Sequence, residues 1–172
     1  GQPGHETDTL ERIERFQLGS VVSFTGRVPA ETIARAYAEA TIAVVPSLYE
    51  GFGFPAGEAM ACEVPVVSSR AGALPEVVGE DGRCGLLIPA KDGAALASAI
   101  DTLLADPARR RALGAAGRAR VLEQFTWRRA AERTVEAYRE AIAARLPRMA
   151  AGQLRRIDRS EHIKARVGAY PC

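Results

Sequence analysis

Residues 42–58 read IAVVPSLYEGFGFPAGE, and this stretch decides how the chain folds. Its first part, residues 42–45, is a continuous apolar run, which is typical of a strand buried on both faces of a parallel sheet. Its last part predicts a helix that begins at Pro55, because proline is favoured at the first helical position. A buried strand that leads through a loop into a helix is the repeating unit of an α/β domain.

The same alternation extends in both directions along the chain. Short apolar runs predict strands at residues 21–24, 42–45, 64–68 and 85–88. Helical spacing of apolar residues predicts helices at residues 10–18, 29–40, 55–62, 74–78, 92–105, 107–125 and 126–146. Four strands separated by helices predict a doubly wound, Rossmann-like parallel sheet within residues 1–146, with a helical C-terminal part. Residues 147–172 are expected to form an arginine-rich tail.

Composition narrows the class of protein. The 172 residues are 47% hydrophobic and 26% charged, enough for the core of one domain. No apolar run is long enough for a membrane-spanning helix, and the first nine residues contain no signal-peptide pattern. The three cysteines form no Cys-x-x-Cys pair, which predicts neither a disulfide framework nor a zinc site and favours a cytoplasmic location.

The net charge of +2 conceals two halves of opposite sign. Arginines crowd the second half, for example at residues 109–111 and beyond residue 145. Because acidic residues are interleaved and no aromatic stripe accompanies them, the pattern argues against a nucleic-acid partner. A solvated helix face is the simpler interpretation, and a weak peripheral contact with an anionic membrane stays an alternative.

The loop within residues 46–58 carries the chemistry. Gly51 and Gly53 permit a tight turn and expose backbone N–H groups at a helix N-terminus, an arrangement suited to phosphate. Glu50 and Glu58 flank this turn, and an ionised carboxylate accepts hydrogen bonds from the hydroxyls of a diol. A nucleotide-sugar offers a diphosphate, a ribose diol and sugar hydroxyls together, so the pattern favours this ligand. The alternative is that both glutamates are solvated turn and helix residues.

The sequence also resembles a known family. Glu50-x7-Glu58, read with Met-Ala-Cys at 60–62 and Pro-Val-Val at 65–67, is similar to the EX7E region of retaining GT-B glycosyltransferases of family four. Further similar stretches are GALPEVV (72–78), GLLIP (85–89), DP (106–107), FTW (125–127) and VSFTGRV (22–28). The resemblance covers about residues 1–145. It implies a partial C-terminal, donor-binding domain of a two-domain GT-B enzyme.

The resemblance implies a role for each residue of the site. Glu50 would lie at the catalytic centre and bond the hydroxyls of the donor hexose. The backbone amides expected to hold the sugar and diphosphate belong to Gly51, Phe52, Gly53 and Phe54. Glu58 would accept from the ribose diol. The loop expected against the nucleobase consists of Gly26, Arg27 and Val28.

The implied reaction is transfer of a hexose from UDP-hexose or GDP-hexose with retention of configuration. The resemblance implies no cofactor and no metal, and the sequence contains no Asp-x-Asp pair. Two departures concern packing: Gly57 replaces a bulky apolar residue, and Glu63 stands where glycine is usual. A side chain at position 63 is unfavourable if the turn there is left-handed.

The chain is expected to be part of a longer enzyme. An N-terminal acceptor-binding domain and an upstream Arg and Lys for the diphosphate are expected partners outside it. Arg27 and Arg70 are the cations that remain for the diphosphate, although each is interpreted first as a surface arginine. The chain alone is therefore predicted to be inactive, and an apolar face on residues 126–146 predicts self-association. The alternative function is a non-catalytic nucleotide-sugar-binding module or a truncated relic.

Overall fold

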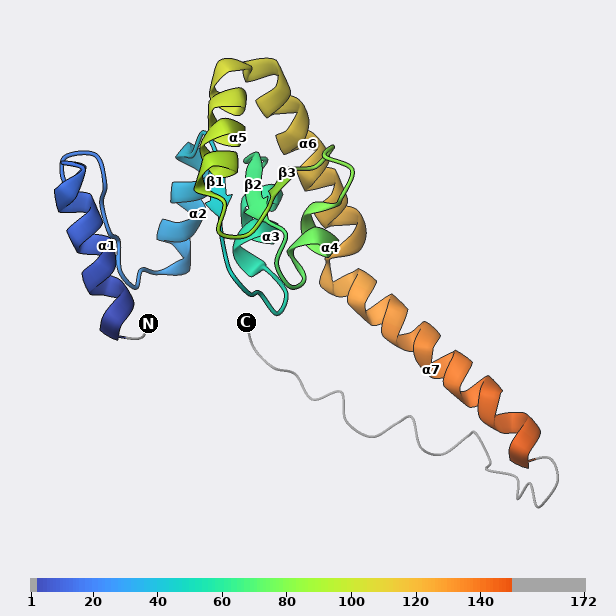
Figure 1. The fold of residues 1–172 in the computed structure, drawn as a ribbon. Coiled ribbons are helices and arrows are strands. Elements are labelled where there is room, and N and C mark those ends of the chain that lie inside the picture. Colours follow the sequence, from blue (N-terminus) through green and yellow to red (C-terminus); the bar gives the residue numbers. More distant parts are fainter. Residues whose placement is uncertain (1–2, 150–172) are drawn as a thin grey trace. The chain divides into compact units, whose positions relative to one another are not determined.

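The computed structural model describes residues 3–149, which Figure 1 shows as a ribbon. The chain divides into two compact units, residues 1–123 and residues 124–172. Each unit is described by itself. Nearly all of the predicted tail, from residue 150 onward, lies outside the described residues.

The helices and strands alternate much as expected. The elements that begin in the first unit are α1 (Pro3–Arg15), α2 (Ala30–Glu39), β1 (Ala43–Val45), α3 (Phe54–Ala61), β2 (Val66–Ser69), α4 (Leu74–Val78), β3 (Leu86–Ile88), α5 (Gly93–Ala105) and α6 (Pro107–Gln124). The second unit contains α7 (Trp127–Met149). Among the described residues, no helix is both long and apolar enough to cross a membrane.

The sheet is parallel, in the order β1-β2-β3. Val66 on β2 lies opposite Ala43 on β1, and Val67 lies opposite Leu86 on β3. Successive side chains of a strand point to opposite faces, and all four residues of β2 are buried, so both faces of this strand are covered. The α/β parallel architecture is the one that the sequence predicts.

The expected strand at residues 21–24 does not form, and this prediction is wrong. The segment has no strand pairing, and Val21 and Phe24 are 76% and 67% exposed. A strand needs the backbone of a neighbour to satisfy its hydrogen bonds. Residues 21–24 pair with no strand of the described sheet, which therefore has three strands rather than four.

The core lies between the sheet and the helices that follow it. One cluster joins Val67 and Ile88 of the sheet to Leu103 of α5 and Leu113 of α6. Other fully buried side chains come from α3 and α4, among them Met60 and Leu74. Figure 1 shows β1, β2 and β3 in the interior of this unit with α3 and α5 beside them. The packed strands thus hold their carboxyl ends, and the loops that leave them, in fixed positions.

Three arginines of α6 bond the carbonyl groups at the ends of other helices. Arg110 donates to the Leu104 carbonyl at the end of α5 (2.7 Å). Arg118 donates to the Ala61 carbonyl at the end of α3 (2.5 Å). Arg120 donates through Nε to Val77 (2.9 Å) and through Nη2 to Glu76 (2.7 Å) in α4. The last carbonyls of a helix have no partner within it, so α6 stabilises three helix C-termini at once.

The turn after α3 is left-handed. Glu63 has φ 62°, a conformation in which a side chain is strained. The helix α6 passes close to this turn, because a Cβ at Gly114 would lie 2.0 Å from the Glu63 carbonyl oxygen. Gly114 is thus required by the close approach of two backbones, whereas Glu63 occupies a position that glycine would fill with less strain.

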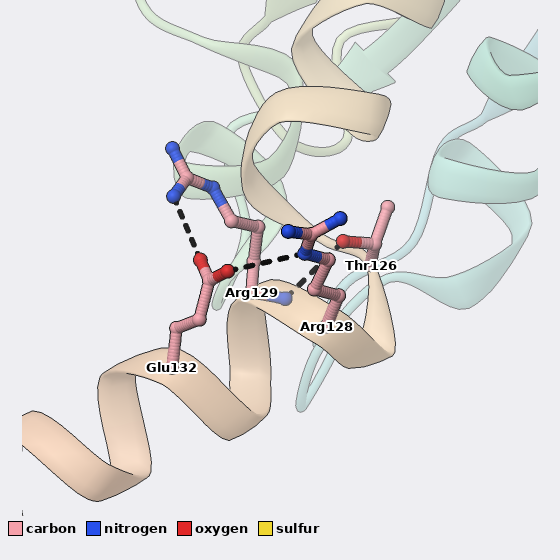
Figure 2. Close-up of polar contacts among 4 residues, drawn as sticks. All are labelled: Thr126, Arg128, Arg129 and Glu132. Carbon is pink, nitrogen blue, oxygen red and sulfur yellow. Dashed lines mark hydrogen bonds and ion pairs between the residues drawn. The ribbon is translucent and has the colours of Figure 1, made fainter.

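Local hydrogen bonds explain the start of α7 (Figure 2). The Thr126 hydroxyl accepts from the Arg129 backbone N–H (3.3 Å), as a helix N-cap does. Glu132 accepts from Arg129 (2.8 Å) and Arg128 (3.2 Å), and these hydrogen bonds, Arg129 first, lower the pKa of its carboxyl. The helix continues to Met149, three residues beyond the expected end.

Candidate functional site

The predicted site loop leaves the carboxyl end of β1 and enters α3, at the edge of the sheet where doubly wound domains bind ligands. Gly53 precedes α3 with φ 95° and is buried. A Cβ at Gly53 would lie 2.8 Å from Cδ2 of Leu74, so both its backbone angle and its neighbour require glycine. Pro55 lies in the first turn of α3, which begins one residue earlier than expected.

Glu50 is half-buried, and both its side chain and its backbone form hydrogen bonds with neighbouring residues. Ser47 donates its hydroxyl hydrogen to Oε1 of Glu50 over 2.8 Å. Ser69, at the end of β2, donates its own hydroxyl to the carbonyl oxygen of Ser47. The carboxylate is therefore tied, through one serine and then another, to the buried strand in the middle of the sheet.

The backbone of Glu50 is held just as closely. Its carbonyl oxygen accepts from the Ala73 N–H over 3.0 Å. Gly72 has φ 53°, and a Cβ there would lie 2.1 Å from the same carbonyl oxygen. The loop after β1 and the loop after β2 thus meet backbone to backbone at Glu50, with no room for a side chain at Gly72.

Glu58 lies on the exposed surface of α3 and faces α2. The Tyr37 hydroxyl lies 3.4 Å from Oε2 of Glu58 and 3.3 Å from the Pro55 carbonyl oxygen, and its single hydrogen is shared between these acceptors. Burial, and then the negative charge of Glu58, raise the pKa of Tyr37. At neutral pH the hydroxyl is therefore a donor that orients Glu58.

A cavity of about 280 Å³ lies between α2 and α3. Its lining is mainly apolar and consists of Ala30, Ile33, Ala34, Tyr37, Glu58, Ala61 and Cys62. The loop predicted to contact a nucleobase precedes α2 directly: Gly26 has φ 61°, Arg27 is exposed and Val28 is half-buried. The element that lines this cavity with Glu58 is thus the helix that follows the predicted loop.

The remaining predicted residues offer backbone amides and aromatic surface. Gly51, Phe52 and Phe54 are exposed. The rings of Phe52 and Phe54 lie 4.9 Å apart between centroids and are tilted by 45°. The turn around Gly53 therefore carries an exposed pair of aromatic rings.

Lys91 brings positive charge near the loop, because it lines a pocket together with Pro46 and Leu48. Arg70, directly after β2, lies 3.4 Å from the Glu80 carboxylate, and both side chains are largely exposed. An exposed ion pair is weak, about 0.2–1 kcal/mol, so Arg70 is only loosely held by Glu80. Within residues 3–149, three His, Cys, Asp or Glu side chains nowhere gather as a metal site would require.

Two side chains of this site were not among the residues predicted from the sequence: Ser47 and Tyr37. A local signal existed for Ser47, because Ser-x-x-Glu is a spacing at which the two side chains reach each other in a turn. Tyr37 belongs to α2, outside the predicted loop. Its contact with Glu58 joins residues 21 apart, and no local pattern announces such a contact.

The fold and the loop define a Rossmann-like α/β domain with a ligand loop at the carboxyl edge of a parallel sheet. Residues 1–106 match the family model described as "Glycosyl transferases group 1", and the chain belongs to this family. Over 142 residues it is 43% identical to the MMP alpha-(1->4)-mannosyltransferase of Mycolicibacterium hassiacum, a match that covers 83% of this chain and 34% of that protein. The chain thus spans about a third of the length of the curated relatives it matches.

Solved structures of similar fold include two proteins that match about four fifths of this chain. Sucrose-phosphate synthase from Thermosynechococcus elongatus matches 82% of this chain and 35% of its own, with 41% identity and a TM-score of 0.72. Anabaena Alr3699/HepE, solved in complex with UDP-glucose, matches 81% of this chain and 38% of its own, with 26% identity and a TM-score of 0.74. These matches confirm the expected Rossmann-like, C-terminal GT-B fold.

Proposed function

We propose that this chain is the donor-binding portion of a retaining glycosyltransferase that transfers a hexose from a nucleotide-sugar. The observation that carries the proposal is the placement of Glu50 and Glu58. Glu50 precedes the glycine turn, and Glu58 lies in the helix that follows this turn. Each carboxylate accepts a hydrogen bond from a neighbouring hydroxyl. Two oriented carboxylates beside the backbone amides of a glycine turn suit a ligand that carries both hydroxyls and phosphates.

Each residue takes the part that its surroundings favour. Glu50, beside the amides of Gly51 to Phe54, binds the hexose hydroxyls at the reacting centre. Glu58, at the cavity between α2 and α3, binds the ribose diol, and Gly26, Arg27 and Val28 border the nucleobase. A UDP-glucose complex of a structural relative supports a UDP-hexose donor, and GDP-hexose is the second candidate. The retaining, metal-independent reaction of the EX7E enzymes of family four belongs to the same proposal.

The proposed transfer reaction also needs an acceptor site. Because the chain spans about a third of its relatives, we propose that the acceptor site lies on a further N-terminal domain and that this chain alone does not transfer sugar. The charge of a diphosphate also needs cationic partners, and we propose that some of them come from outside this chain. Cytoplasmic location, weak membrane contact and self-association remain predictions.

Calorimetric titration with UDP, GDP, ADP and their hexose conjugates tests the proposal. We expect one nucleotide to bind and Glu58→Ala to weaken it by about 1.5–3 kcal/mol, the usual worth of a hydrogen bond to a charged group. Glu39→Ala, an exposed acid at the end of α2, is the matched control and should change nothing. Equal affinity of the wild type and Glu58→Ala would remove Glu58 from the site.

Glu50→Ala separates the hexose from the nucleotide. It should leave the affinity for the plain nucleoside diphosphate unchanged and weaken only the nucleotide-sugar. Equal losses for both ligands would contradict the assignment of Glu50 to the hexose. The alternative, a non-catalytic binding module, predicts the same binding but no transfer when the chain is joined to the N-terminal domain of a relative.

A further inference from the structure

Glu50 is the carboxylate on which the proposed function depends most, and its side chain has one described donor. Ser47 Oγ lies 2.8 Å from Oε1 of Glu50, a normal length for a hydrogen bond from a hydroxyl. We propose that Ser47 is a positioning residue: it fixes the Glu50 carboxylate so that the other oxygen, Oε2, faces the donor hexose. This inference rests on the proposed function and assigns a new part of the same site.

The chemistry of a carboxylate explains why one anchored oxygen matters. An ionised carboxylate only accepts hydrogen bonds and rotates freely at the end of the glutamate side chain. A donor on Oε1 selects one orientation before the ligand arrives. The sugar hydroxyl then meets an oriented acceptor and does not lose binding free energy by ordering it.

Ser47 is itself held firmly enough to do this. The Ser69 hydroxyl donates to its carbonyl oxygen, and Ser69 is 1% exposed in the middle strand of the sheet. On the other side, the Glu50 backbone is fixed by the Ala73 N–H and by its close approach to Gly72. Both ends of the Ser47–Glu50 pair are therefore attached to β2 or to the loop that follows it.

A matched pair of variants isolates the hydroxyl. Threonine and valine have nearly the same shape, but only threonine carries the donor. In Ser47→Thr we expect the wild-type preference for the nucleotide-sugar over the plain nucleotide. In Ser47→Val we expect the affinity for the nucleotide-sugar to fall about fivefold, the usual effect of one hydrogen bond, while the affinity for plain UDP or GDP is unchanged.

Titration of both variants with UDP, UDP-glucose, GDP and GDP-mannose gives the ratio of the two affinities. A merely structural role of Ser47 would weaken nucleotide and nucleotide-sugar alike, and that result would overturn the inference. So would an unchanged ratio in Ser47→Val. Thermal unfolding of each variant verifies that it is folded.

Crystal structures of the wild type and Ser47→Val keep this test independent of the proposed function. If the wild type binds no nucleotide-sugar, the proposed function fails, and the position of the Glu50 carboxylate still decides the inference. We expect the carboxylate to leave its place in Ser47→Val and to keep it in Ser47→Thr. The same Glu50 rotamer in all three structures would contradict a positioning role.

Discussion

Glu63 shows at the residue scale how a single backbone angle sets the cost of a side chain. With φ 62°, its Cβ crowds the following carbonyl, a strain of about 1–2 kcal/mol that glycine avoids. We expect Glu63→Gly to raise the free energy of unfolding by about 0.5–1 kcal/mol, because the greater freedom of glycine in the unfolded chain offsets part of the gain. Urea unfolding measures this difference.

Glu63→Ala is the control for that experiment. Both substitutions remove the exposed ion pair with Arg118, whose closest atoms are 3.6 Å apart, and only alanine keeps the strained Cβ. Equal stability of the alanine and glycine variants would contradict the prediction, because the strain at position 63 would then not exceed the conformational freedom that glycine adds to the unfolded chain.

Replacement by alanine should have opposite effects on stability at Gly57 and at Gly114. Gly57 lies within α3, and a Cβ there would meet Val77 at an ordinary 4.0 Å, so Gly57→Ala should stabilise the helix by about 1 kcal/mol. At Gly114 the new methyl group would lie 2.0 Å from the Glu63 carbonyl oxygen, so Gly114→Ala should destabilise the protein by about 1–3 kcal/mol. Thermal unfolding of both variants checks the signs, and a loss of stability in Gly57→Ala would refute the space assigned to position 57.

At the scale of elements, the arginines of α6 connect this helix to the C-terminal ends of three others. Arg120 bonds two carbonyls at the end of α4, and removing a charged donor from such groups costs about 1–3 kcal/mol. We expect Arg120→Met to lower the free energy of unfolding by about that amount in a urea titration. Arg111→Met, at an exposed position on the same helix, is the control, and its free energy of unfolding should stay within about 0.5 kcal/mol of the wild type. Equal losses of stability in both variants would contradict a stabilising role of the bonds from Arg120 to α4.

The elements also show what a sequence predicts and what it does not. The three strands of the sheet were predictable because each begins in a short apolar run followed by turn residues, although only β2 is buried along its whole length. Residues 21–24 have the same local pattern, yet strand formation depends on a neighbour that lies elsewhere in the chain, and local spacing carries no information on pairing.

The site divides in the same way. The glycine turn and the start of α3 near Pro55 were predictable because they belong to one loop and one helix, whereas the roles of the two glutamates stay predictions. The bond from Ser69 to Ser47 and the contact of Tyr37 with Glu58 join elements about 20 residues apart. Packing of these elements against one another creates the contacts, so only the fold reveals them.

At the scale of the whole molecule, the predicted self-association concerns α7. Its large apolar side chains recur at helical spacing and are exposed: Trp127, Val135, Tyr138 and Ile142. An uncovered stripe of this kind favours association of copies of the chain. We expect sedimentation equilibrium at rising protein concentration to give an average mass above the 18.4 kDa of one chain. The double variant Val135→Glu with Ile142→Glu should return this mass to 18.4 kDa. A single mass of 18.4 kDa at all concentrations would refute the prediction.

The thiol of Cys62 allows a fluorescent label to be attached at the cavity between α2 and α3. Cys62 is exposed and lines the cavity together with Glu58, whereas Cys84 is half-buried. With Cys84 and Cys172 replaced by serine, an environment-sensitive fluorophore attached to Cys62 would lie beside the proposed ribose site. Its emission would report each arrival and departure of a nucleotide in real time, so the kinetics of donor binding become measurable without a radioactive label or an acceptor.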